Sequence, residues 1–182
     1  IEIVGEVRSD IPAYNVIGQL PGTSADLDHK MIIVAAQYDA PPNDLREPAP
    51  GANDNASGVA TMLEMIRTIQ DSGYQPFKTI LFVAYSGEGL PDQAMAPPAR
   101  SFLESKYGFQ EAFDFEAVIH VRGMGVGQEN TLGIWSNEQG AVSKLLETAA
   151  HLTRMETQRV EGPSSMNVFP PKADRSDPEI PQ

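Results

Sequence analysis

Three stretches decide the fold: KMIIVAA at residues 30–36, VATMLEMIRTI at residues 59–69 and KTILFVAY at residues 78–85. The first and third are continuous apolar runs of strand length, which is typical of strands buried on both faces of a sheet. The middle stretch places its apolar residues at helical spacing, at Val59, Met62, Leu63, Ile66 and Ile69. A strand, a helix and a strand in this order predict a parallel arrangement of the two strands.

Further elements flank this unit on both sides. Residues 1–7 and 14–20 resemble an antiparallel pair of strands, and AVIHV at 117–121 and TLGIWS at 131–136 read as two more strands. A second amphipathic helix is predicted from Val142, Leu145, Leu146, Ala149 and Leu152, and residues 157–161 form a last short strand. The alternation predicts an α/β fold: a three-layer α/β/α sandwich with a mixed, mostly parallel central sheet.

This fold class comes with expectations about position. The antiparallel pair should lie toward one edge of the sheet, and the strands that begin near Lys30, Lys78 and Ala117 should be central and buried. For the first helix, the sequence offers N-cap candidates and a stop, namely Asn53, Asn55, Ser57 and Gly73.

Composition excludes several classes of function. The 182 residues include 25 Asp and Glu against 13 Lys and Arg, which gives a formal charge of -12. No cluster of basic side chains exists, so neither nucleic acid nor an anionic membrane surface is an expected partner. The absence of cysteine rules out disulfides and cysteine-based zinc sites. Only three histidines remain, and no two of them share helical spacing: His29, His120 and His151.

Polar residues follow the predicted parallel strands at the points where those strands end. Asp39 follows the first buried strand, Asp54 precedes the first helix, and Glu88 follows the next strand. Ligand sites in open α/β sheets form beyond the carboxyl ends of the strands, so these carboxylates are expected to converge. They form either a metal site or a patch of solvated acids. The glycines after residue 121 leave a third hypothesis open, a nucleotide-binding loop, although their GxGxG spacing does not match GxGxxG.

Several of these stretches resemble one family. GANDNASGVATMLE at 51–64 is preceded by IIVAAQYDA at 32–40 and followed by TILFVAYSGEG at 79–89. Together with NVIGQLPG at 15–22 and AVIHVRGMG at 117–125, they resemble the zinc-dependent aminopeptidases of metallopeptidase clan MH, family twenty-eight. The resemblance implies a site of two zinc ions that share a bridging aspartate and a water, with a glutamate as general base.

Only part of that site carries over. The resemblance places the bridging aspartate at Asp54, followed by a matching Asn55, and implies a cis peptide bond between them. The first histidine ligand falls on Gln37, although its orienting aspartate is kept at Asp39. Glu88 fits the general base best, which leaves Gly89 at a ligand position, but Glu88 also fits the ligand position and the sequence leaves both open.

The remaining two ligand positions are also changed. An acidic ligand falls on Arg122, a cation, and the last histidine has no match, with Met166 near its place. Asp54 is thus the one retained ligand that the resemblance assigns firmly, whereas a zinc site needs at least three. We therefore expect no bound zinc or other cofactor. We expect Arg122 to point into the former metal site and to pair with Asp54 or Glu88.

The function expected from these residues is that of an aminopeptidase-like domain without zinc catalysis, acting as a structural or binding module for an unidentified protein or peptide. Related domains of this kind exist in receptor ectodomains and in subunits of protease complexes. The alternative is an active hydrolase in which Gln37, Asp54 and Glu88 hold a hard cation through oxygen. Residues 1–182 are expected to be a single domain within a longer, exported protein, with a C-terminal strand and helix missing.

Overall fold

A computed structural model describes residues 14–27, 30–39, 51–86, 114–125, 130–136 and 140–160. They belong to two compact units, Ile1–Val126 and Gly127–Gln182. Outside the described residues lie the predicted first strand and His29, as well as Glu88, Gly89 and Met166 of the predicted site. The single-domain organisation stays a prediction.

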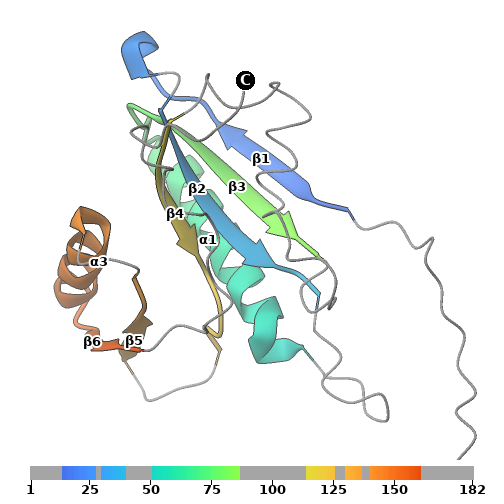
Figure 1. The fold of residues 1–182 in the computed structure, drawn as a ribbon, viewed down its shortest axis with the longest axis vertical. Coiled ribbons are helices and arrows are strands. Elements are labelled where there is room, and N and C mark those ends of the chain that lie inside the picture. The colour runs from blue at the N-terminus through green and yellow to red at the C-terminus, as the bar shows by residue number, and fades with distance from the viewer. Residues whose placement is uncertain are drawn as a thin grey trace, which may run out of the picture. The chain divides into compact units, whose positions relative to one another are not determined.

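The first unit contains a mixed four-stranded sheet. Its strands are β1 (Val16–Leu20), β2 (Lys30–Gln37), β3 (Thr79–Tyr85) and β4 (Asp114–His120), in the order β1-β3-β2-β4. β2 runs parallel to β3 and β4, as predicted (Figure 1). β1 lies at one edge of the described order, as expected, but it pairs antiparallel with β3; its expected partner, residues 1–7, lies outside the described residues. The expectation that the strand near Ala117 is central is wrong for the described sheet. After β3 the chain returns to the far side of β2, so β4 ends the described order.

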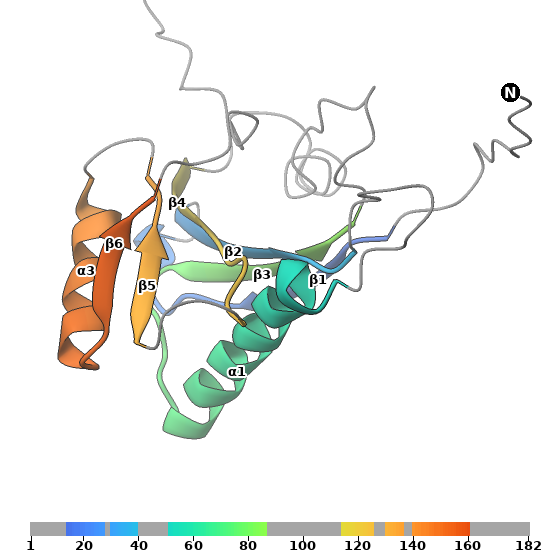
Figure 2. The same ribbon diagram turned by 90° about the horizontal axis from the view of Figure 1, so that it is seen from below.

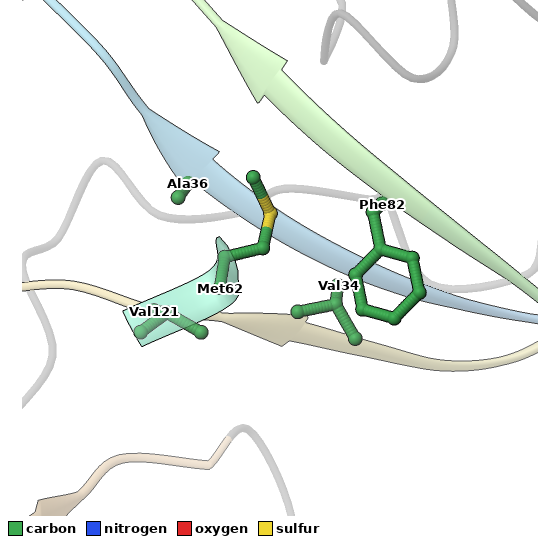
Figure 3. Close-up of a cluster of buried hydrophobic side chains, with 5 residues drawn as sticks. All are labelled: Val34, Ala36, Met62, Phe82 and Val121. Carbon is green, nitrogen blue, oxygen red and sulfur yellow. The ribbon is translucent and has the colours of Figure 1, made fainter. Parts of the chain in front are cut away.

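Helix α1 (Ser57–Ser72) covers one face of this sheet, after a π-helical turn, η2 (Ala52–Ala56) (Figure 2). It ends, as predicted, at Gly73, whose φ of 67° is the left-handed conformation that favours glycine. Met62 of α1 packs into a core cluster with side chains from β2, from β3 and from the residue after β4 (Figure 3): Val34, Ala36, Phe82 and Val121.

The helical pattern was wrong at one position. Leu63 is 58% exposed, although its spacing placed it with the apolar face. Successive helical residues are about 100° apart. With Met62 at the centre of the contact and Ile66 and Ile69 on the same side, Leu63 is turned out of the contact with the sheet.

Strands β2 and β3 are buried on both faces, as their continuous apolar runs predict. Alternate residues of a strand point to opposite faces, and Val34 and Phe82 point toward α1. The residues of the opposite face are also buried: Ile33, Ala35, Leu81 and Val83.

The second unit contains α3 (Ala141–Leu152), which packs against two short parallel strands, β5 (Thr131–Ile134) and β6 (Glu156–Arg159). All three elements were predicted within a few residues of these bounds. Leu145 and Leu152 are 67% and 78% exposed, so the predicted apolar face of α3 is narrower than its spacing indicated. None of the helices in the described part of the chain is long and apolar enough to span a membrane.

Candidate functional site at the carboxyl ends of β2 and β4

The candidate site lies where β2 and β4 end beside the turn that leads into α1. Parallel neighbours bring their carboxyl ends to the same sheet edge. Gln37 closes β2, Arg122 follows β4, and η2 carries Asp54 and Asn55. Sequence positions 37, 54 and 122 therefore meet because of the topology, as the alternation of strands and helices predicted.

Arg122 and Asp54 form a two-pronged ion pair. The guanidinium donates from Nε to Asp54 Oδ1 at 2.8 Å and from its Nη2 to Oδ2 at 2.8 Å. The side chains are 29% and 44% exposed, respectively, so the pair lies at the boundary between interior and solvent. Both carboxylate oxygens are engaged by one permanently charged group. The prediction that Arg122 pairs with Asp54 or Glu88 is confirmed for Asp54.

Asn55 is the buried centre of the site. Its Nδ2 donates to the carbonyls of Gln37 at 3.2 Å and Val121 at 2.9 Å, and its Oδ1 accepts from the Gly123 amide at 3.1 Å. One side chain thereby joins the ends of β2 and β4 to the entrance of α1. The Asp54–Asn55 peptide bond is cis, as the family resemblance implies.

The predicted N-caps have a different role. The residue at the N-cap of α1 is Ala56, and among the described residues no side-chain hydrogen bond caps the helix. Instead Ser57 Oγ accepts from the Met124 amide at 2.9 Å and Asn53 Oδ1 accepts from the Gly125 amide at 2.9 Å. With Asn55, these side chains engage three successive amides after β4. Those amides are the groups that a phosphate would need, so the structure argues against a nucleotide-binding loop here.

Gly58 is required by this packing. A Cβ built at position 58 would lie 2.4 Å from both Asn55 Oδ1 and the Val121 carbonyl oxygen. Such distances are far below van der Waals contact. The first turn of α1 and the end of β4 can approach this closely only because residue 58 has no side chain.

His120 lies on the sheet face opposite α1 and meets Tyr85 across β2. His120 Nε2 and the Tyr85 hydroxyl are 2.7 Å apart. The strand between them presents the small Ala35, which is in register with His120 and leaves room for the contact. The pKa of His120 is lowered to about 4, first because burial disfavours the charged ring and second because the Arg122 cation is near, while Asp54 acts in the opposite direction. His120 is therefore neutral at pH 7.

Gln37 is fully buried, yet its side-chain Oε1 and Nε2 have no hydrogen-bond partner among the described residues. The same holds for His120 Nδ1. Unpaired buried polar atoms are costly and rare in folded proteins. The face of the sheet opposite α1 thus carries buried polar atoms that no described residue pairs.

The described residues do not fit the two-zinc site that the resemblance implies. An amide, Gln37, stands at a histidine position, and the bridging Asp54 is engaged at both oxygens by Arg122. No group of three or more His, Asp or Glu side chains is gathered for metal binding within the described ranges. Asp39 lies at the end of β2 with Oδ1 buried, while Glu88, Gly89 and Met166 lie outside those ranges.

Some of these residues were not singled out from sequence. Tyr85 read only as the last residue of a buried strand, and Gly58 only as part of the motif at 51–64. Tyr85 could have been identified as a site residue because it is a tyrosine at the carboxyl end of a central parallel strand. For Gly58, the signal was a glycine in the first turn of a predicted helix, where glycine is unfavourable without a packing reason.

Comparison with known proteins assigns the sequence to a family. A family model described as Peptidase family M28 matches residues 15–175. The chain belongs to this family. In this M28 chain, the two described positions where the resemblance to zinc aminopeptidases implies other ligands, Gln37 and Arg122, lie at the same sheet edge as Asp54.

Two curated relatives of this M28 chain differ in kind. Human transferrin receptor protein 2 is 32% identical over 122 residues, which cover 65% of this chain and 13% of the receptor. A probable zinc metalloprotease of Pyricularia oryzae is 34% identical over 89 residues, which cover 47% of this chain and 17% of that protein. The chain thus spans less than a fifth of the length of either relative.

Two solved structures share the fold of this M28 chain. LapB from Legionella pneumophila superposes with a TM-score of 0.62 at 19% identity, over 87% of this chain and 44% of LapB. A glutaminyl cyclase from an Acidobacteriales bacterium gives a TM-score of 0.58 at 15% identity, over 82% of this chain and 52% of the cyclase. At these identities the likeness concerns the fold alone.

Proposed function

We propose that this chain is an M28-fold domain that has lost zinc catalysis and serves as a structural or binding module for a protein or peptide. The observation that carries the proposal is the two-pronged pair of Arg122 with Asp54. A carboxylate that bridges two metal ions must offer an oxygen to each, and both Asp54 oxygens accept hydrogen bonds from a cation instead. A curated relative whose name is that of a receptor supports a binding role.

We further propose that the complete fold is a three-layer α/β/α sandwich. The burial of β2 and β3 on both faces supports a covering layer on the face opposite α1. The M28-like architecture of the two solved structures supports the same arrangement.

Metal content and peptidase activity together test the loss of catalysis. Purified protein is dialysed against zinc, bound metal is measured by elemental analysis, and hydrolysis of leucyl- and alanyl-p-nitroanilide is followed. We expect no stoichiometric zinc and no hydrolysis above buffer, with an active M28 zinc aminopeptidase as positive control. Arg122→Asp alone should remain inactive, because Gln37 still stands at a histidine position. Stoichiometric zinc with hydrolysis that Glu88→Gln abolishes would refute the proposal.

A hydrolase with an oxygen-bound hard cation is a second candidate. Its support is the Gln37 amide oxygen, which is buried and has no partner within the described ranges. Ca²⁺ and Mg²⁺ accept such an oxygen together with carboxylates. Calorimetric titration with either ion discriminates the two candidates. The hydrolase candidate predicts stoichiometric binding of Ca²⁺ or Mg²⁺ that Asp54→Asn removes. The binding-module candidate predicts no binding of either ion.

A further inference from the structure

One buried side chain holds the backbone on both sides of Arg122. Asn55 donates to the Val121 carbonyl and accepts from the Gly123 amide, so the residues before and after Arg122 are bonded to the same amide group. These contacts join positions 66 and 68 residues apart in the chain. The backbone of Arg122 is therefore fixed in position relative to η2.

The partner of Arg122 is fixed from the same place. Asp54 immediately precedes Asn55, and Asn55 is buried and also bonded to the end of β2. Both members of the ion pair are thereby positioned by one residue. Two further hydrogen bonds fix the residues after Gly123 to the start of α1. The Gly125 amide donates to Asn53, and the Met124 amide donates to Ser57.

The guanidinium brings a positive charge to a carboxylate that lies in an acidic protein. The chain carries a formal charge of -12, and Asp39 follows β2 at the same sheet edge. A metal ion would neutralise Asp54 only while bound. The charge of Arg122 is present at all physiological pH values and does not dissociate.

We infer that the Asp54–Arg122 pair is an internal replacement for a bound cation and that Asn55 is the positioning residue for this pair. The junction between η2 and β4 is then held without metal. This inference rests on the proposed loss of zinc, and it adds the device that keeps the emptied site folded.

A double-mutant cycle measures the pair directly. Asp54→Asn, Arg122→Gln and the double variant are unfolded with urea in the presence of EDTA. We expect the two substitutions to be coupled by about tenfold in the folding equilibrium constant, within the range of neighbouring charged residues. The matched control is the Arg67–Asp71 pair of α1, with side chains 62% and 65% exposed, whose coupling should stay below about threefold.

The positioning role has its own readout. In Asn55→Ala, the Asp54–Arg122 coupling should fall to the level of the Arg67–Asp71 control, and the Arg122 Nε–H signal in NMR should lose its protection from solvent exchange. If Asn55→Ala does not fold, Asn55→Ser gives the same readout with a smaller change in volume. Full coupling and full Nε–H protection in the Asn55 variant would overturn the positioning role.

The outcomes separate this inference from the proposed function. Stoichiometric zinc in the wild type, together with destabilisation by EDTA, would refute the proposed function and the inference with it. No zinc but a coupling no larger than that of the control pair would refute the inference alone. No zinc, insensitivity to EDTA and a coupling of about tenfold would support both.

Discussion

Gly58→Ala adds one methyl group to the first turn of α1, where helix propensity alone would favour alanine by about 1 kcal/mol. The structure predicts the opposite outcome. The added Cβ would lie 2.4 Å from the Val121 carbonyl oxygen and 2.4 Å from Asn55 Oδ1. The first neighbour is backbone and cannot swing aside, so either Asn55 must leave its position or α1 must move away from the end of β4.

The cost follows from what Asn55 holds. If its side chain is displaced, the carbonyls of Gln37 and Val121 and the amide of Gly123 lose their partner. Each buried polar group left unpaired costs about 1–3 kcal/mol. After subtraction of the helix-propensity gain, and with partial relaxation, we expect Gly58→Ala to lower the free energy of unfolding by about 3–5 kcal/mol.

Urea unfolding followed by circular dichroism at 222 nm measures this loss. Gly18→Ala in β1 is the matched control, because a Cβ at position 18 meets no atom of the described residues within 4 Å. The free energy of unfolding of this variant should therefore change little. Asn55→Ala should cost a similar amount to Gly58→Ala, and the double variant less than the sum, because both remove the same hydrogen bonds. A Gly58→Ala protein within about 1 kcal/mol of the wild type would refute the reasoning.

Three further outcomes are expected. Folding lowers the pKa of His120 from 6.5 to about 4. Between these pH values His120 is therefore protonated in the unfolded chain but neutral in the native protein. The free energy of unfolding should therefore fall by up to about 3 kcal/mol from pH 6.5 to 4, and His120→Gln should flatten this part of the pH profile. Gln37→Met should leave thermal stability unchanged or raised, because the Gln37 amide is buried without a partner in the described ranges; a loss above about 1 kcal/mol would contradict this. Met62→Ala should cost about 2–5 kcal/mol in urea unfolding, whereas Leu63→Ala, one residue further on the same helix, should cost under about 1 kcal/mol.

The sequence by itself determined β2, α1 and β3 of the first unit and the parallel arrangement of these two strands. Continuous apolar runs specify β2 and β3, helical spacing specifies α1, and Gly73 ends α1, because each of these signals is local to a few residues. The Asp54–Arg122 pair could also be predicted from the sequence. Parallel strands bring their carboxyl ends to one sheet edge, so an arginine that follows one of these strands can reach an aspartate at the same edge.

Only the tertiary structure decided how the motif before α1 is used. Asn53 and Ser57 looked like helix caps from local sequence, yet they bond to amides 72 and 67 residues away. Likewise, Leu63 is exposed because it is turned away from the sheet, and β4 ends the described sheet order because the chain returns to the far side of β2 after β3. The physical reason is the same in each case. A polar side chain near a helix start accepts a hydrogen bond from whichever amide the fold brings close to it. A helix buries only those residues that face its sheet. Long-range packing, rather than neighbouring residues, decides both.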